Sequence, residues 1–148
     1  MFAKATFAAL LSVMAVPAMA AQCEVTIEGN DAMQFNTKEI VIDKSCEDFT
    51  INLVHTGKLP KAAMGHNVVI TKAADKQAVA NDATSAGPAN DYLKPNDDRV
   101  LAHTKMIGGG EKDSVTFKTA AFEAGGDYDF FCSFPGHWAI MSGKVVVK

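Results

Sequence analysis

Short segments in which apolar and polar residues alternate constrain the fold of this chain more than any other feature. Alternating segments occupy residues 23–28, 49–55 and 114–118, and apolar runs of strand length occupy residues 68–70, 128–132 and 144–147. Alternation is typical of half-buried strands, because successive side chains of a strand point to opposite faces of a sheet. Clusters of Gly, Pro, Asn and Asp separate the segments, as expected for turns. We therefore predict an all-β sandwich of seven or eight short strands.

One segment lacks this alternation. Residues 72–91 are rich in Ala, Asp, Asn and Ser. Within this segment, residues at helical spacing are Ala73, Ala74, Gln77, Ala78 and Asn81. We predict that they form one short helix inserted between two strands. The sequence shows no internal repeat, linker or second domain.

Length, composition and charge narrow the possible functions. The chain has 148 residues, of which 48% are hydrophobic, so it is long enough for one globular domain with a buried core. Its 14 basic and 17 acidic residues give a formal net charge of -3. Without a cationic surplus, the chain is not expected to bind nucleic acid through non-specific phosphate contacts. Disordered tails and repeat arrays are excluded by the same composition.

The first twenty residues have the three regions of a secretory signal peptide. Lys4 supplies positive charge, residues 7–16 form an apolar stretch, and residues 18–20 (Ala-Met-Ala) match the small-x-small cleavage pattern. A membrane anchor, the alternative, needs about 20 continuous apolar residues, more than this stretch provides. Because a short, Ala-rich segment is typical of bacterial export, we predict a mature chain of residues 21–148 in the periplasm. No later segment is apolar enough for membrane insertion.

The chain has three cysteines, an odd number for a protein exported to an oxidising compartment. Cys23 and Cys46 lie near the predicted mature N-terminus, each beside strand-like sequence. A disulfide between them closes a loop of roughly 24 residues and stabilises the fold by about 3 kcal/mol through loop entropy. Cys132 is then left alone. It is either buried and inert or bound to a ligand.

The residues after Cys132 form a Cys-x4-His-x3-Met pattern with His137 and Met141. Pro135 and Gly136 force a tight turn inside this segment, so the thiol, imidazole and thioether can point at one place. His66, at the start of the apolar run 68–70, offers a second imidazole. Two His and one Cys with a weak axial Met are the ligands of blue-copper electron-transfer sites. The pattern therefore predicts a site for one copper ion.

Other interpretations of these residues remain open on the pattern alone. Taken singly, Cys132 and Met141 are typical core residues, and His66 and His137 are typical of structural or loop positions. A thiol enzyme with Cys132 as nucleophile and a histidine as base needs an orienting group and an oxyanion hole, and neither is evident. The same ligands suit structural zinc or a metal-storage site. A cupredoxin domain of an oxidase or nitrite reductase needs a further copper centre with additional His ligands, and two of the four His in this chain already belong to the first site.

The sequence resembles the azurins, a family of bacterial type I copper proteins within the cupredoxins. The resemblance covers the whole predicted mature chain. It is carried by residues 64–67 (Met-Gly-His-Asn) and 131–137 (Phe-Cys-Ser-Phe-Pro-Gly-His), by the Cys23/Cys46 pair, and by residues 36–37, 91–95, 102–105 and 111–117. Plastocyanins and pseudoazurins lack the inserted segment at 72–91. One departure is Val68, where family members often carry a core Trp; the single Trp here is Trp138.

The resemblance implies a Greek-key sandwich that binds one type I copper ion. His66, Cys132 and His137 correspond to the equatorial ligands and Met141 to the axial ligand, with the Gly65 carbonyl on the opposite side. The backbone N–H groups of Asn67 and Phe134 correspond to the donors to the thiolate sulfur. Asn67 is also placed to join the two ligand loops through its side-chain amide.

The resemblance also implies an electron carrier, not an enzyme, that acts as a monomer. Its partners would be transient redox proteins such as periplasmic cytochromes, reductases or dehydrogenases. An apolar docking patch around His137 is expected to contain Met33, Leu59, Met64, Pro135, Trp138 and Ala139. For the two remaining histidines, we expect a structural role for His55, which ends an alternating segment on its apolar side, and an exposed position for His103.

Overall fold

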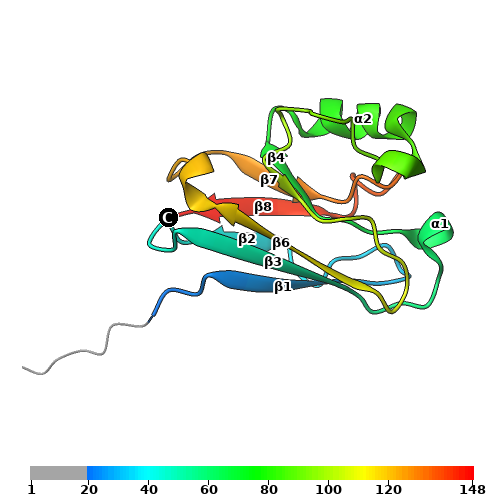
Figure 1. The fold of residues 1–148 in the computed structure, drawn as a ribbon, viewed down its shortest axis with the longest axis horizontal. Coiled ribbons are helices and arrows are strands. Elements are labelled where there is room, and N and C mark those ends of the chain that lie inside the picture. The colour runs from blue at the N-terminus through cyan, green and yellow to red at the C-terminus, as the bar shows by residue number, and fades with distance from the viewer. Residues whose placement is uncertain (1–19) are drawn as a thin grey trace, which may run out of the picture.

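The computed structural model describes residues 20–148, so the predicted signal peptide lies outside it except for Ala20. Eight strands form two sheets packed face to face (Figure 1). The three-stranded sheet consists of β1 (Glu24–Gly29), β3 (Asp48–His55) and β6 (Lys112–Lys118). The five-stranded sheet consists, in order, of β2 (Glu39–Ile42), β8 (Ser142–Val147), β7 (Tyr128–Phe131), β4 (Val69–Lys72) and β5 (Ala102–His103). The predicted all-β Greek-key sandwich is confirmed.

Strand order differs from chain order in both sheets. The pairs β1–β3 and β2–β8 run parallel, whereas β3–β6, β7–β8, β4–β7 and β4–β5 are antiparallel. The consecutive strands β1, β2 and β3 lie in alternate sheets, because the chain crosses from one sheet to the other after β1 and again after β2. The described helices are the short α1 (Lys61–Met64), the longer α2 (Lys76–Ala86), and the 3-10 turns η1 (Pro88–Asn90) and η2 (Thr119–Ala121).

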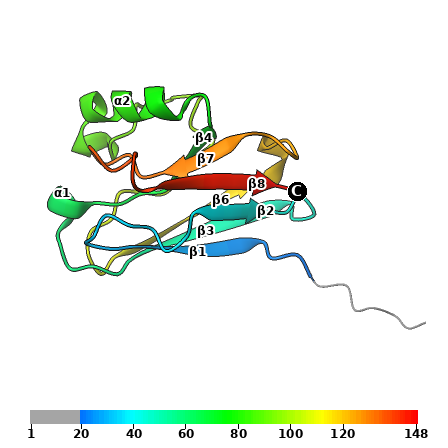
Figure 2. The same ribbon diagram turned by 180° about the vertical axis from the view of Figure 1, so that it is seen from behind.

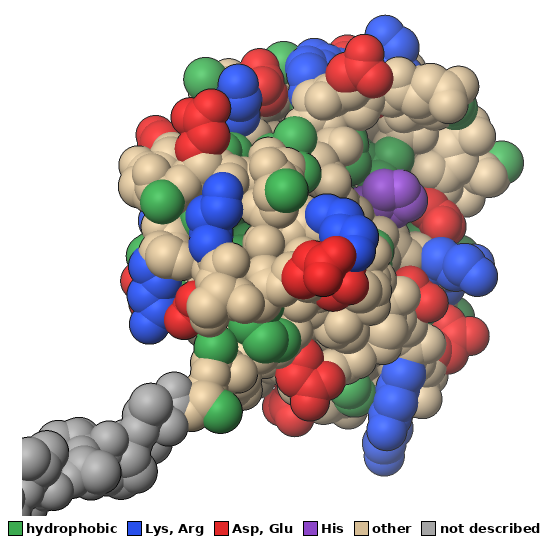
Figure 3. Space-filling model, turned by 60° about the vertical axis from the view of Figure 1, so that its left-hand side comes forward, with side chains coloured by type: hydrophobic (Ala, Val, Ile, Leu, Met, Phe, Trp, Pro, Cys, Tyr) green, Lys and Arg blue, Asp and Glu red, His purple; other side chains and the backbone are tan. Residues whose placement is uncertain are grey.

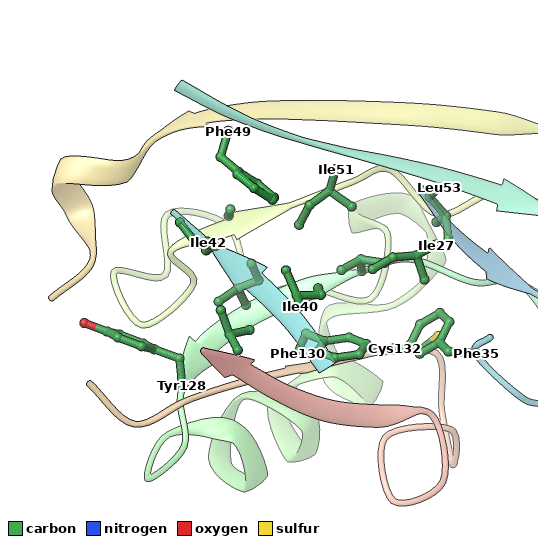
Figure 4. Close-up of a cluster of buried hydrophobic side chains, with 14 of the residues drawn as sticks. Ile27, Phe35, Ile40, Ile42, Phe49, Ile51, Leu53, Tyr128, Phe130 and Cys132 are labelled. Atoms are coloured by element: carbon green, nitrogen blue, oxygen red, sulfur yellow. The ribbon is translucent and has the colours of Figure 1, made fainter. Parts of the chain in front are cut away.

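The core lies between the sheets and follows the alternation seen in the sequence. In β3, Phe49, Ile51 and Leu53 are buried, while the residues between them are only half-buried. Ile40 and Ile42 of β2 meet them from the opposite sheet (Figure 4). Burying each such side chain contributes about 1.5–3 kcal/mol, so this layer is the main source of stability.

Helix α2 explains why some strands read as continuous apolar runs. It lies over the outer face of the five-stranded sheet, as Figures 1 and 2 show from opposite sides. There Val79 and Ala80 pack against Val69 of β4 and Phe131 of β7. Both faces of these two strands are thus covered, and neither face needs polar residues. The inserted helix is confirmed, but Ala73 and Ala74 lie in the turn before it. Its buried residues are Val79, Ala80 and Ala83, whereas Gln77, Ala78 and Asn81 are exposed.

The structure adds three elements that the sequence patterns did not single out. β2 is four residues long, β5 has two and α1 has four. The two-residue β5 is too short for any periodic pattern, whereas β2 is no shorter than β4 and β7, which were predicted from their apolar runs. All six predicted strand segments, by contrast, correspond to observed strands.

The two ends of the sandwich have different roles. A disulfide joins Cys23 and Cys46, as predicted, just before β1 and β3 begin. The loops that carry His66 and residues 132–141 lie at the other end, beside α1 (Figure 1). Figure 3 shows acidic and basic side chains interleaved on one face, with apolar side chains scattered among them. Across residues 20–148, no helix combines the length and apolar character required to cross a bilayer.

Candidate metal centre

The loop after β7 folds back on itself and brings three of the predicted ligands together. His137 N–H donates to the Phe134 carbonyl at 2.9 Å and closes a tight turn. Gly136 occupies the left-handed region at φ 83, which a type II turn requires at its third residue. Met141 N–H then donates to the His137 carbonyl at 2.8 Å, and Cys132 N–H donates to the Met141 carbonyl at 3.0 Å. Hydrogen bonds within this loop, between two paired strands, therefore set the spacing of these residues.

His66 completes the cluster from the loop before β4. Its Nδ1 lies 3.9 Å from Cys132 Sγ, and His137 Nδ1 lies 3.6 Å from the same sulfur. The three ligand atoms all lie within 4.8 Å of one another. Cys132, His66 and Met141 are fully buried, and His137 retains an exposed fraction of only 2%. The arrangement is a closed site with one side chain reaching toward the surface.

Hydrogen bonds fix the orientation of the His66 ring. Its Nε2 lies 2.8 Å from the Asn30 carbonyl oxygen. Because a carbonyl only accepts, Nε2 carries the proton and Nδ1 presents a lone pair toward Cys132. The backbone of His66 also exchanges two hydrogen bonds with Ile107, of 3.0 and 2.9 Å. Gly29 packs against the ring, where an added Cβ would lie 2.7 Å from His66 Cδ2.

The backbone of Gly65 brings a carbonyl oxygen close to the site. Its carbonyl lies 3.7 Å from Cys132 Sγ. A Cβ at Gly65 would lie 2.6 Å from the Lys61 carbonyl and 3.0 Å from Met106 Sδ. Only glycine therefore permits this close approach of the backbone to the site.

Burial sets the protonation state of the cluster. It raises the pKa of the Cys132 thiol to about 12, although backbone N–H groups of Asn67 and Phe134 favour the thiolate. Burial, with a contribution from His66, lowers the pKa of His137 to about 4. It also lowers the pKa of His66, against the opposing effect of the hydrogen bond to Asn30. Both imidazoles are thus neutral at pH 7, as ligation requires, and a bound cation would displace the thiol proton.

The side chain of Asn67 joins the two ligand loops. Its Oδ1 accepts Ser133 N–H at 2.8 Å, and its Nδ2 donates to Ser133 Oγ at 2.8 Å. Asn67 is fully buried, and Ser133 follows Cys132 directly. The amide therefore fixes the loop of His66 against the loop of Cys132.

The donor set fits copper. One thiolate and two imidazoles favour a soft or borderline metal, and no carboxylate takes part. Between residues 20 and 148, these residues form the one group of three or more His, Cys, Asp or Glu side chains placed to bind a metal. Residues 21–148 match a family described as copper-binding proteins of the plastocyanin/azurin family. The chain belongs to this plastocyanin/azurin family.

Individual azurins are similar along most of their length. The azurin of Alcaligenes faecalis is 66% identical over 123 residues, which cover 83% of this chain and 96% of the relative. That of Achromobacter denitrificans is 62% identical over 145 residues, covering 98% and 97%. That of Pseudomonas aeruginosa is 54% identical over 148 residues and the full length of both chains. Membership of this azurin-containing family makes the chain a copper electron carrier and not an enzyme.

His55 has a contact that the sequence analysis missed. It is buried, as expected for a structural residue, and its ring stacks on His66 with 4.4 Å between centroids. Its Nε2 lies 2.7 Å from the Met64 carbonyl, and Gly57 N–H donates to its Nδ1 at 3.1 Å. The contribution of Asn30 was also missed, because a backbone carbonyl leaves no mark in the sequence. His103 is exposed, as expected.

The residues of the predicted docking patch all retain some exposure. Leu59 is 42% exposed and Ala139 is exposed, whereas the half-buried members are Met33, Met64, Pro135 and Trp138. Trp138 packs on one side against the apolar cluster under α2, beside Phe131. Ile140, in the loop that carries His137, was not among the predicted residues but is 56% exposed.

Proposed function

We propose that this protein carries single electrons between redox proteins of the bacterial periplasm. One copper ion would cycle between Cu(I) and Cu(II), and residues 1–20 would be removed on export. The observation that carries this proposal is the convergence of one Cys and two His ligand atoms within 4.8 Å in a buried site. Membership of a copper-binding family supports it.

We assign His66, Cys132 and His137 as the residues that would hold the ion. Met141 and the Gly65 carbonyl would bind it more weakly. When bound, copper supplies a one-electron couple and a thiolate charge-transfer absorption. The fully buried Met141 and the close Gly65 carbonyl support this assignment.

The protein itself provides a rigid and dry ligand cage. The hydrogen bonds of His66 and Asn67 would hold the ligand atoms in place. A preformed site changes little in geometry when the metal changes charge, which favours fast electron transfer. The N–H groups of Asn67 and Phe134 would stabilise negative charge on Cys132 sulfur and so raise the reduction potential.

His137 is the proposed route for the electron, because it is the one ligand side chain with an exposed fraction above zero. Around it, Met33, Leu59, Met64, Pro135, Trp138 and Ala139 would form an apolar docking patch. Weak redox encounters use small interfaces. A monomer with such a patch would bind periplasmic cytochromes, reductases or dehydrogenases briefly and release them.

The absorption spectrum of the copper-loaded, oxidised protein beginning at Ala21 tests the proposal. An intense blue band is expected from the Cys132–Cu(II) bond. Cys132→Ser should abolish the band, and zinc loading of the unchanged protein should give none. A Cys132→Ser variant that stays blue would overturn the ligand assignment, and a colourless copper-loaded protein would overturn the function. N-terminal sequencing after export in a bacterium tests cleavage after Ala20.

A further inference from the structure

Two consecutive residues after η1 adopt a conformation that side-chain-bearing residues avoid. Asp91 has φ 52 and Tyr92 has φ 53, both in the left-handed region. In residues 20–148, the other non-glycine residues at positive φ are Met33 and Asn96, and neither has such a neighbour. The left-handed region costs roughly 1–2 kcal/mol for an L-amino acid. Such strain persists where surrounding contacts enforce it, and it often marks a functional position.

The strained turn is attached firmly to the inserted segment. Asp91 N–H donates to the Pro88 carbonyl at 3.1 Å, and Tyr92 N–H donates to the Gly87 carbonyl at 3.0 Å. The next residue, Leu93, is buried in the apolar cluster under α2. The turn is therefore joined to the inserted segment on both sides.

Asp91 contacts the pair of residues that joins the ligand loops. Its carbonyl oxygen accepts from Asn67 Nδ2 at 3.3 Å and from Ser133 Oγ at 3.5 Å. Both donors belong to nearly or fully buried residues. Without this carbonyl, one buried N–H of the Asn67 amide would lose its partner, which is costly in a dry environment.

Tyr92 contacts the other side of the same site. Its ring lies edge-on to Phe134, with 5.3 Å between centroids and an interplanar angle of 64°. Phe134 in turn lies 4.5 Å from the His137 ring. Each residue of the turn thus contacts one of the two residues, Asn67 and Phe134, whose backbone N–H groups are the proposed donors to Cys132 Sγ.

We propose that the left-handed turn formed by Asp91 and Tyr92 positions both N–H donors to the sulfur of Cys132. The inserted segment is then a third support of the metal centre, beyond the two ligand loops. This inference rests on the proposed copper site. Hydrogen bonds to a ligating sulfur stabilise its negative charge, so loss of either donor lowers the reduction potential of the bound metal.

The test compares Tyr92→Ala with Tyr92→Phe, which keeps the ring. In the metal-free protein, Tyr92→Ala should accelerate amide hydrogen exchange at Phe134 by roughly two- to tenfold, the range expected for loss of one aromatic pair. In the copper-loaded protein, it should lower the reduction potential and shift the thiolate band to lower energy. Tyr92→Phe should leave all three quantities at wild-type values. If Tyr92→Ala folds poorly, Tyr92→Leu replaces it.

Phe117→Ala is the matched control for general destabilisation. Phe117 is also a half-buried aromatic residue, but it packs on Phe49 and Phe122 in the core. Phe117→Ala should lower the melting temperature without changing the reduction potential or the thiolate band. If Tyr92→Ala does no more than this, the turn is only structural and the inference is wrong. If the copper-loaded wild type shows no blue band, the proposed function fails, while amide exchange still decides whether the turn holds Phe134.

Discussion

His66 Nε2 donates to the Asn30 carbonyl oxygen at 2.8 Å, and this bond directs Nδ1 toward the sulfur of Cys132. The acceptor comes from the loop after β1, remote in sequence from the ligand loops. That loop is itself held by Asp31, whose carboxylate accepts Lys58 N–H at 2.7 Å. The direction of one ligand thus depends on a backbone carbonyl in a distant loop.

Gly29→Ala tests this dependence. Because an added Cβ would lie 2.7 Å from His66 Cδ2, the ring must shift away from its position opposite Cys132. We expect weaker copper binding and a changed thiolate band, measured by metal titration followed in the visible spectrum.

Gly126→Ala is the control for Gly29→Ala. Its Cβ would also clash with an aromatic ring, that of Tyr128, but away from the ligands. This variant should lose stability and keep wild-type copper affinity. Equal copper affinity in both variants would show that Gly29 does not position His66.

Local sequence predicted the parts of the site that local geometry builds. Cys132, His137 and Met141 share one loop, and the Pro-Gly turn inside it determines their spacing. The stacking of His55 on His66 could not be read in this way, since it depends on how β3 meets the loop before β4. The strained turn at Asp91 and Tyr92 was not predicted either, because Asp is only a weak signal of a positive φ and Tyr is none.

The fold was predictable wherever one face of a strand is buried and the other is exposed. Strand β3 shows this alternation over its whole length. β4 and β7 do not, because α2 covers their outer face. β5 has only two residues, which pair with Val69 and Ile70 of β4. Two residues are too few to show a periodic pattern.

Removing the disulfide should reduce stability without changing the metal site. The double variant Cys23→Ser/Cys46→Ser is expected to lose about 3 kcal/mol of unfolding free energy, as estimated for a loop of roughly 24 residues. The bridge precedes β1 and β3, whereas the ligand loops lie beyond the opposite ends of these strands. Urea unfolding measures the loss, and an altered blue band would contradict the separation of the two ends.

Asp129 should make the fold sensitive to acid. Burial raises the pKa of its carboxyl, but Lys144 and Lys76, at 2.7 and 2.6 Å, lower it further, so the net shift is downward. A carboxyl with a lowered folded-state pKa stabilises the protein above its unfolded pKa and loses this effect as pH falls through the folded value. Asp129→Asn should therefore cost about 1–3 kcal/mol at neutral pH.

Urea unfolding at two pH values checks this prediction. The difference between Asp129→Asn and wild type should vanish once the pH lies below the folded-state pKa of Asp129. Asp127→Asn is the control, since Asp127 also pairs with Lys144 at 3.0 Å but is largely exposed. It should change stability little at either pH. An Asp129→Asn variant as stable as wild type at neutral pH would refute the role of the ion pairs.

Met141→Leu separates tuning of the metal from metal binding. A thioether is a weak axial ligand, so the three equatorial residues should still hold blue copper. The reduction potential should rise, because electron donation to Cu(II) falls. Met106→Leu is the control, because Met106 is buried beside Gly65 but is not a proposed ligand. Voltammetry of both variants measures the effect, and equal potentials would remove Met141 from the ligand set.

Charge near His137 should slow electron transfer without changing the metal. Leu59→Asp and Ala139→Asp each place a carboxylate on the proposed docking patch, at exposed positions that are not proposed ligands. The spectrum and potential should stay close to wild type. Electron self-exchange should slow by roughly tenfold or more, because two copies would face each other with like charges that must be desolvated.

Ala120→Asp distinguishes position from net charge. Ala120 is exposed on η2, which follows β6 at the end of the sandwich away from the ligand loops. Ala120→Asp adds the same charge far from His137. Because salt screens distant charges, its self-exchange rate should remain near that of wild type at moderate salt. Slowing confined to Leu59→Asp and Ala139→Asp supports electron exit through His137. Wild-type rates in both patch variants would place the exit elsewhere, even with copper bound by the proposed ligands.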